Sequence, residues 1–380
     1  MTKTCTSYNP QKSRNTATTA EGRLNALPVL SPQKINDCLD EFGYHGQNEA
    51  RRSVCLNAYR HVKRLKSLHV KKIPCHLLPQ HSNAILIGPT GCGKSYIIEL
   101  IFGKILKLPY VIVEMTRFAE TGYVGDDVLN ILTRLLESAN GDIGLAECGV
   151  VALDEFDKIA GSNSNARFAG QGTTKDVSGY GVQRELLKMV EGADIQIPLD
   201  YGFSNRGSRS VMSTRNITFF ALGAFTGFKD VERSGRSGIG FNKNAEKEER
   251  IAYKLSEEEA EDIGGFQTYG FIPELIARFN RITLFQPLDA ATLTKILCKK
   301  LEKYKVEFNE EGFELQVNNN VFDFLVKEAL KKKTGARALD SAIMKYLEGV
   351  CFECFGQGRI GTVTLRLGKG KLRSEVKIRA

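Results

Sequence analysis

The sequence predicts an α/β fold in which helices cover both faces of a parallel sheet, followed by a smaller, mainly helical α+β domain. Three observations support this prediction. Short continuous runs of Val, Ile, Leu and Phe alternate with helical patterns along most of the chain. A glycine-rich segment follows the first of these runs and directly precedes a helical pattern. Beyond Pro287 the apolar spacing becomes mostly helical, and short strand patterns close the chain.

The strands of the sheet are predicted at five apolar runs, Ala84–Ile87, Tyr110–Val113, Val150–Leu153, Ile217–Leu222 and Ile282–Phe285. Before them, helical spacing predicts two helices between Ser31 and Leu68 that are broken at Gly43–Gln47. Segments rich in Gly, Ser, Asn or charge predict long loops at 161–175, 200–215 and 231–249. We expect a helix over Ile97–Leu106, directly after the glycine-rich segment.

The smaller domain is predicted from three helical patterns, Ala290–Asn309, Val321–Lys332 and Gly335–Phe355. Its strands are expected at Phe313–Val317, Gly361–Leu367 and Val376–Ile378. The first residues of the chain are polar and carry no pattern, which is typical of a disordered tail. The predicted organisation is therefore a tail over 1–27, a large domain over 28–286 and a small domain over 287–380.

Composition excludes several classes of protein. The chain has 380 residues, of which 42% are hydrophobic and 26% are charged, and this balance is too apolar for general disorder. No apolar run approaches the roughly 18 residues that a membrane helix needs. Nine cysteines show no framework spacing, which favours a reducing compartment, the cytoplasm. The C-x-x-C at Cys351 and Cys354 leaves a zinc pair or buried thiols, and its helical context favours thiols, so no zinc is expected.

The chain is basic, with 53 Lys and Arg against 44 Asp and Glu, a net charge of +9. Such a charge suits nucleic acid or an acidic partner surface. The basic residues are nevertheless scattered, with modest runs only at 60–72 and 327–333. Solvated helix faces are the favoured interpretation of these runs, and a nucleic-acid partner is the less favoured one.

A phosphate-binding motif follows the first predicted strand. The G-x-x-x-x-G-K-[ST] pattern consists of Gly88, Pro89, Thr90, Gly91, Cys92, Gly93, Lys94 and Ser95. Glycines in this context turn backbone N–H groups toward phosphate oxygens at a helix N-terminus. Lys94 suits the β- and γ-phosphates, and the Ser95 hydroxyl suits Mg²⁺. The motif predicts an ATP site with a bound magnesium ion.

Acidic residues end another predicted strand. Asp154 and Glu155 follow Val150–Leu153, and a carboxylate at the carboxyl end of a buried parallel strand faces the ligand crevice. Asp154 suits the Mg²⁺ shell, and Glu155 suits polarising the attacking water. Alone, the pair could equally be a helix cap, but together with the P-loop it predicts ATP hydrolysis.

The segments around these motifs resemble those of the ClpX family, the AAA+ protein unfoldases that feed the ClpP peptidase. The resemblance is carried, in order, by residues 86–95, 121–128, 149–159, 176–183, 237–241, 271–278 and 334–337. It covers about residues 28–367. It implies an AAA+ P-loop NTPase domain with its small domain, a homohexameric ring with ATP between neighbouring subunits, and a polypeptide pulled through the pore.

The resemblance also assigns roles outside the P-loop. It implies that Tyr123 and Val124 belong to the pore loop that grips substrate. It implies that Arg278 is the arginine finger for a neighbour's γ-phosphate and that Arg337 is the sensor arginine of the small domain. Docking to a ClpP-type peptidase would use Ile239, Gly240 and Phe241.

Departures from the family pattern are also visible. The family's N-terminal zinc domain is absent from residues 1–27, which contain a single cysteine, Cys5. Tyr44 and His45 stand where the family places aliphatic residues against adenine, so we expect an altered base pocket. Leu222 replaces a small residue next to the sensor position, which could slow hydrolysis. These departures indicate a divergent member.

Three functional hypotheses follow. The leading one is an ATP-dependent protein unfoldase and translocase with no peptidase activity of its own, since the chain offers no nucleophile–base constellation. The second is an AAA+ motor that remodels nucleic acid. The third is a regulatory protein that holds ATP without turnover. The aromatic and aliphatic character of 122–125 favours the first over the second, because a nucleic-acid motor is expected to carry a basic loop there.

Overall fold

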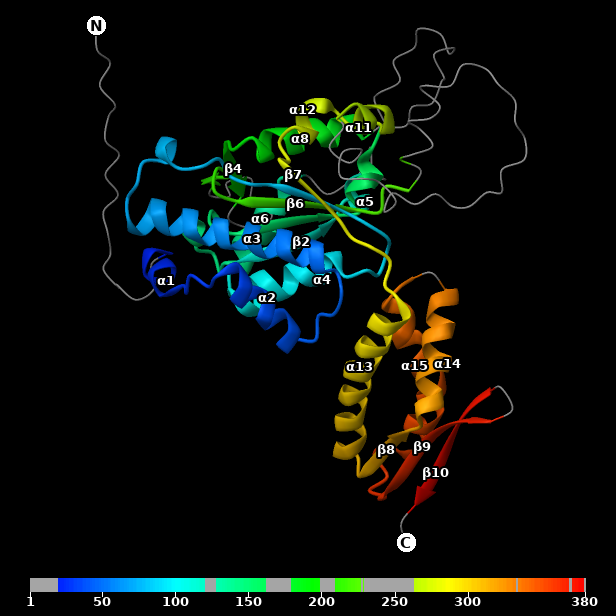
Figure 1. The fold of residues 1–380 in the computed structure, drawn as a ribbon. Helices are drawn as coiled ribbons and strands as arrows, with labels where there is room; N and C mark the ends of the chain where they lie inside the picture. The colour runs from blue at the N-terminus through cyan, green and yellow to red at the C-terminus, as the bar shows by residue number, and fades with distance from the viewer. Residues whose placement is uncertain are drawn as a thin grey trace, which may run out of the picture.

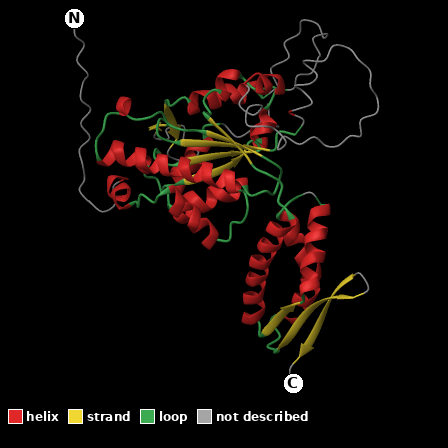
Figure 2. Ribbon diagram, in the orientation of Figure 1, coloured by secondary structure: helices red, strands yellow, loops and turns green. Residues whose placement is uncertain are grey.

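The structure is a computed structural model of the chain. It describes residues 20–119, 128–161, 179–198, 209–226, 228, 263–332, 334–368 and 371–378. Figure 1 shows a larger body built around a sheet, and a smaller body, coloured from golden yellow to red, beyond it. Figure 2 shows that helices lie on both sides of the larger sheet, whereas the smaller sheet lies at one end of a group of helices.

The larger sheet contains the five predicted strands. They are β1 (Ala84–Ile87), β2 (Tyr110–Glu114), β3 (Val150–Asp154), β6 (Thr218–Gly223) and β7 (Arg281–Leu284). All pair in parallel, in the order β2-β3-β6-β1-β7. The order confirms a parallel α/β sheet and places the ends of β1 and β3 on either side of β6.

Successive residues of the central strands face two different cores. Val150 and Ala152 of β3 pack in one core, while Val151 and Leu153 pack in the other. The first core is completed by α2 (Pro32–Glu41), α3 (Asn48–Leu65), α4 (Lys94–Ile98) and the π-helix η3 (Glu99–Ile105). The second is completed mainly by α6 (Asn130–Ser138), α7 (Ile143–Ala146), α8 (Tyr180–Val190), α11 (Ile263–Tyr269), α12 (Pro273–Ile276) and the 3-10 helix η4 (Phe156–Ile159). This covering of both faces explains the continuous apolar runs.

The smaller body has its own core. Its helices are α13 (Ala290–Glu310), α14 (Asn319–Lys331) and α15 (Arg337–Cys354), and its strands are β8 (Phe313–Val317), β9 (Gly361–Gly368) and β10 (Lys371–Ile378). The strand order is β10-β9-β8, with an antiparallel β9–β10 pair and a parallel β8–β9 pair. The predicted helices and strands are confirmed, and the last strand is longer than predicted. Cys354 is buried in this core, and Cys351 is half-buried against it.

Two segments differ from the sequence-based expectations. The end of the predicted tail forms α1 (Ala20–Ala26), because Leu24 finds a buried site against Leu65 and Cys148. The end of the loop predicted over 200–215 forms β5 (Arg209–Ser213), which pairs with β4 (Asp194–Pro198) in an antiparallel hairpin. In this hairpin Ile197 and Met212 are fully buried against the large core, which stabilises a strand that the Gly/Ser-rich composition conceals.

The remaining described elements are short: α5 (Thr116–Ala119), the π-helix η1 (Lys66–Val70) and the 3-10 helix η2 (Cys75–Leu77). None of the helices in the described part of the chain has the length and apolar character required to cross a membrane.

Candidate nucleotide site

The P-loop connects the carboxyl end of β1 to the start of α4. Gly91 and Gly93 take φ values of +75° and +98°, a region that favours glycine. Gly88 donates its N–H to the Gly223 carbonyl at 3.1 Å, and a Cβ at Gly88 would lie 2.6 Å from the Phe285 carbonyl oxygen. The glycines of the motif are therefore required by backbone shape, and the loop is attached to the ends of β6 and β7.

Lys94 is folded back into the loop. Its side chain is buried, and its Nζ donates to the carbonyls of Gly88 at 2.6 Å and Pro89 at 2.9 Å. These bonds hold the ammonium inside the curve of the loop, beside the N-terminus of α4. A positive point charge at a helix N-terminus suits the oxygens of a phosphate chain.

Ser95 and Asp154 meet across the carboxyl edge of the sheet. The Ser95 hydroxyl donates to Asp154 Oδ2 at 2.6 Å, although the two residues come from opposite sides of β6. The other carboxylate oxygen of Asp154 accepts the N–H of Glu155 at 3.0 Å. A hydroxyl and a carboxylate are hard oxygen donors, and a pair of them beside a phosphate-binding loop fits Mg²⁺.

Glu155 occupies a strained turn. Its φ is +55°, in the left-handed region, and its side chain is exposed at the start of η4. Asp157, two residues later, is buried, and its Oδ1 accepts the N–H of Ala224 at 3.2 Å. This bond fixes η4 to the end of β6 and so positions Glu155. Asp157 was not singled out from the sequence, because its role depends on a residue 67 positions away.

Tyr44 packs directly on the P-loop. It is 4% exposed, its hydroxyl donates to the Gly93 carbonyl at 3.3 Å, and its ring stacks on Tyr96 at 6.1 Å. A Cβ at Gly93 would lie 3.0 Å from the Tyr44 hydroxyl, so glycine is needed there for packing as well. Burial raises the pKa of Tyr44, which keeps the phenol neutral. These contacts join Tyr44 to the P-loop, and an altered base pocket stays a prediction.

The loop around Tyr44 is tightly anchored. Arg51 is buried, and its guanidinium donates to Asp40 at 2.7 Å, to both oxygens of Asn36 and to the Tyr44 carbonyl at 3.3 Å. The hydrogen bond from Arg51 holds the pKa of Asp40 below its usual value. Gln47 pairs with the backbone of Gln286, donating at 2.6 Å and accepting at 2.9 Å. These bonds position residues 43–47 against the P-loop.

Leu222 is fully buried in the core formed with α2, α3 and α4, next to Leu86 of the neighbouring strand. Tyr44 and Cys92 of the nucleotide site belong to the same core. The expectation that Leu222 slows hydrolysis stays a prediction, and such an effect would act through packing in this core.

The small domain touches the P-loop through two glycines. The N–H of Ala336 donates to the Gly91 carbonyl at 3.1 Å. A Cβ at Gly335, where φ is +56°, would lie 2.5 Å from that same carbonyl oxygen, and a Cβ at Gly91 would lie 2.1 Å from the Thr334 carbonyl. Arg337, the exposed first residue of α15, follows directly and is thus held close to the phosphate-binding loop.

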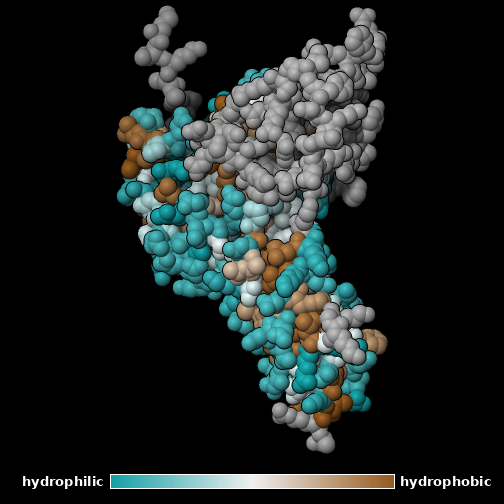
Figure 3. Space-filling model, turned by 45° about the vertical axis from the view of Figure 1, so that its right-hand side comes forward, coloured by the Kyte–Doolittle hydropathy of each residue, from teal (hydrophilic) through white to brown (hydrophobic). Residues whose placement is uncertain are grey.

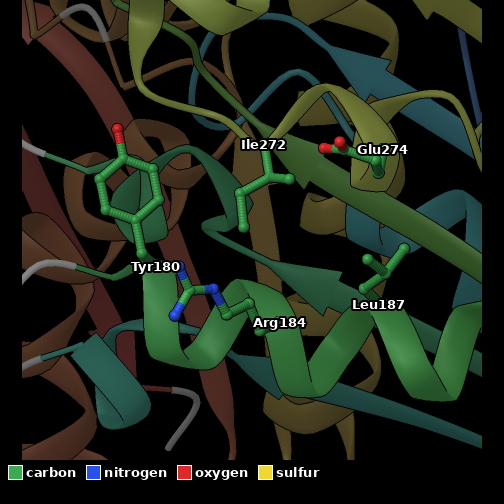
Figure 4. Close-up of a pocket in the computed structure, with 5 residues that line it drawn as sticks. All are labelled: Tyr180, Arg184, Leu187, Ile272 and Glu274. Carbon is green, nitrogen blue, oxygen red and sulfur yellow. The ribbon is translucent and has the colours of Figure 1, made fainter.

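Arg278 lies on a different surface of the large domain. It follows α12, is half-exposed, and pairs with Glu191 at the end of α8 at 2.5 Å. A pocket of about 570 Å³ lies between the same two helices. Figure 4 shows Tyr180, Arg184 and Leu187 on α8 around this pocket, with Ile272 and Glu274 on the facing segment. The structure thus does not bring Arg278 together with the P-loop of its own chain.

Five of the predicted site residues lie outside the described residues. They are Tyr123 and Val124 of the expected pore loop and Ile239, Gly240 and Phe241 of the expected docking loop.

Comparison with known families gives two matches. Residues 80–282 match the model for the AAA domain of the Cdc48 subfamily, and residues 288–363 match the C-terminal D2-small domain of ClpB protein. The first match alone spans more than half of the chain.

Curated relatives cover almost the whole chain. The ATP-dependent Clp protease ATP-binding subunit ClpX of Azotobacter vinelandii is 34% identical over 90% of this chain and 78% of its own length. The proteins of the same name from Bacteroides fragilis and Borrelia duttonii are each 33% identical, over 87% and 85% of this chain and 79% and 74% of their own lengths. With the fold and the P-loop geometry described above, these matches show that the chain belongs to the ClpX family of AAA+ ATPases.

Proposed function

We propose that this chain is an ATP-driven protein unfoldase that threads polypeptide through a ring of its own copies and delivers it to a ClpP-type peptidase. The observation that carries the proposal is the 2.6 Å contact between the Ser95 hydroxyl and the Asp154 carboxylate beside the P-loop. Nucleotide binding with Mg²⁺ uses this pair alone, whereas hydrolysis also needs a group that can align water, and the exposed Glu155 follows directly. Membership of the ClpX family supplies the type of work to which hydrolysis is coupled.

The residues of the site divide the chemistry among them. Lys94 and the P-loop N–H groups bind and orient the phosphate chain. Ser95 and Asp154 would hold Mg²⁺, which neutralises phosphate charge when bound. Glu155, exposed and fixed by its strained turn, would accept a hydrogen bond from the attacking water and align it. Arg278 would approach the γ-phosphate of the next subunit, and Arg337 the P-loop of its own.

A ring assembly is supported by the surfaces that the described residues leave exposed. Phe352 on α15 is 90% exposed, and Met344 on the same helix and Ile360 before β9 are also exposed. Figure 3 shows hydrophobic residues gathered on the visible side of the small domain. Large apolar side chains exposed in this way mark contacts between proteins. A hexamer is the assembly that we propose, with Arg278 facing the neighbour's nucleotide.

Substrate and partner contacts are assigned to residues outside the described part of the chain. Tyr123 and Val124 would grip the polypeptide by shape and dispersion, without reading its sequence. Ile239, Gly240 and Phe241 would dock on the peptidase, which supplies the peptide-bond cleavage. A cytoplasmic location completes the proposal.

The test uses Glu155→Gln, which keeps the size of the side chain and removes its charge. ATP turnover should fall at least about 100-fold while ATP binding is retained. Unfolding of a stable fluorescent substrate should stop in this variant, and also in Tyr123→Ala, whose ATP turnover should continue. Stimulation of turnover by single-stranded DNA and not by unfolded protein would instead support the nucleic-acid motor. Unchanged turnover in Glu155→Gln would refute hydrolysis at this site.

A further inference from the structure

A second cavity lies at the edge of the sheet opposite the P-loop. It has a volume of about 680 Å³ and is formed by α3, the segment before β1 and the first residues of β6 and β7. Its size lies within the range of pockets that hold small ligands. Because it lies at the amino ends of the strands, it is separate from the nucleotide site at their carboxyl ends.

The cavity is strongly cationic. Four of its lining residues are permanently charged, namely Arg60, Lys63, Arg64 and Arg281, and none of the described residues that line it is acidic. Arg60, Lys63 and Arg64 belong to the basic run at 60–72, and the fold adds Arg281 from the start of β7. The proposed unfoldase function makes no use of this concentration of charge.

Two of these cations repel one another. Burial, and then the charge of Arg60, lower the pKa of the Arg281 guanidinium. Within the part of the chain that the structure describes, neither Arg60 nor Arg281 has an ion pair. Both side chains line the same cavity, and no acidic residue among the described residues lines it with them. An anion bound in the cavity would be stabilised by both charges.

Arg64 is held at the cavity wall by two hydrogen bonds from its guanidinium group. Its terminal nitrogens donate to the Pro79 carbonyl and, at 3.1 Å, to Cys75 Sγ. Its Nε is buried and has no hydrogen-bond partner among the described residues. This nitrogen is closed to solvent, so Arg64 contributes to the cavity through the charge of its guanidinium group.

The polar wall of the cavity is neutral and rigid. His61 Nδ1 lies 2.8 Å and His81 Nε2 lies 3.0 Å from the Thr218 hydroxyl, and His61 Nε2 lies 3.0 Å from the Cys148 carbonyl. Burial lowers the pKa of His61 to about 4 and that of His81 to about 3, so both rings are uncharged at neutral pH. The histidines therefore neither add to nor offset the charge of the arginines.

We propose that this cavity binds a small molecule that carries a phosphoryl group, independently of the P-loop. Guanidinium groups match phosphoryl oxygens in geometry, and four cations favour a ligand with two or more negative charges. The volume exceeds the needs of a single inorganic phosphate and admits a diphosphate with an organic group attached. The proposal does not depend on the unfoldase assignment, because no residue of the cavity belongs to the nucleotide site.

The probe is radiolabelled pyrophosphate, measured by equilibrium dialysis on the full chain carrying Lys94→Ala, which removes phosphate binding at the P-loop. We expect one pyrophosphate per chain in this background. Adding Arg60→Ala and Arg281→Ala should weaken that binding at least about 100-fold, because two charge-assisted contacts are lost. Adding Arg52→Ala and Lys327→Ala instead, which removes the same charge from exposed positions outside the cavity, should leave binding within about threefold.

A thermal-shift arm checks that the variants are folded. Without pyrophosphate the Arg60→Ala, Arg281→Ala variant should melt no lower than its Lys94→Ala parent, since repulsion is relieved, and pyrophosphate should raise the melting temperature of the parent alone. Binding of no pyrophosphate at millimolar concentration in the Lys94→Ala chain would overturn the proposal, and so would equal loss in the control variant. Displacement of pyrophosphate by an octaglutamate peptide that binds more tightly would assign the cavity to an acidic protein segment and overturn the phosphoryl ligand.

Discussion

The close approach of Gly335 to the P-loop makes a quantitative prediction about Gly335→Ala. An alanine there would keep a left-handed φ of +56°, which costs about 1 kcal/mol for a residue with a Cβ. Its Cβ would also lie 2.5 Å from the Gly91 carbonyl oxygen. Moving the turn away relieves both problems but gives up the hydrogen bond from Ala336 to Gly91, worth about 1 kcal/mol.

The two costs are alternatives, because opening the turn removes the strain, so the contact is weakened by about 1 kcal/mol, or about fivefold in the equilibrium between closed and open. Because Arg337 is held near the P-loop by this turn, we expect kcat/KM for ATP to fall by about fivefold, measured by steady-state hydrolysis. The matched control is Gly349→Ala in the interior of α15, where a Cβ meets nothing within 4 Å and alanine favours the helix. ATP turnover in Gly335→Ala within twofold of that in Gly349→Ala would refute this reasoning.

Four further predictions follow from the described contacts. Ser95→Ala should lower magnesium-dependent ATP turnover at least about 100-fold while leaving ADP affinity without magnesium within a few-fold, as titration calorimetry would measure. Arg278→Ala should reduce ATP turnover but keep nucleotide affinity at the P-loop, and a loss of affinity would place the residue in its own chain's site. In the folded chain His61 and His81 stay neutral down to about pH 4 and pH 3, respectively. In the unfolded chain each histidine has the ordinary pKa of 6.5, so below that pH the unfolded chain binds more protons than the folded one. The free energy of unfolding should therefore fall as pH drops below 6.5, by up to about 1.4 kcal/mol per unit and per histidine, and urea titrations at pH 7.5 and 5.5 would measure it. Leu24→Ala should cost about 2 kcal/mol of stability by chemical denaturation, with ATP turnover unchanged.

The features that could be predicted from the sequence are those encoded by neighbouring residues. The P-loop, the pair Asp154–Glu155 and the five strands of the large sheet are local patterns, and each element appears where its pattern predicts it. The β5 strand was missed because its Arg-Ser-Val-Met-Ser sequence lacks an apolar run, and its stability comes from Met212 packing on the large core. The π-helical turn after α4 likewise has no signal in apolar spacing.

The contacts that complete the site join residues far apart in the chain, and no local pattern encodes them. Tyr44 reaches Gly93 over 49 positions, and Gln47 reaches Gln286 over 239. The cationic cavity is a similar case, since the basic run on α3 is ordinary for a solvated helix until Arg281 and the buried histidines are brought beside it. A single sequence shows the residue types at such places but not which of them meet.

The contacts of the small domain with the nucleotide site form a connected set. Besides the turn at Gly335, helix α13 lies against the loop that carries Tyr44: a Cβ at Gly43 would lie 3.0 Å from Lys299, and one at Gly46 would lie 3.0 Å from Thr292. The small domain therefore touches both the phosphate-binding loop and the loop packed over it. Glycine at each contact allows the two parts to approach closely. Because the core of the small domain is closely packed, this domain would accommodate a shift of a few tenths of an ångström in either loop by moving as a unit. Through these contacts a change at the P-loop on nucleotide binding would reach the small domain as a whole, which is the mechanical element that the proposed ring requires.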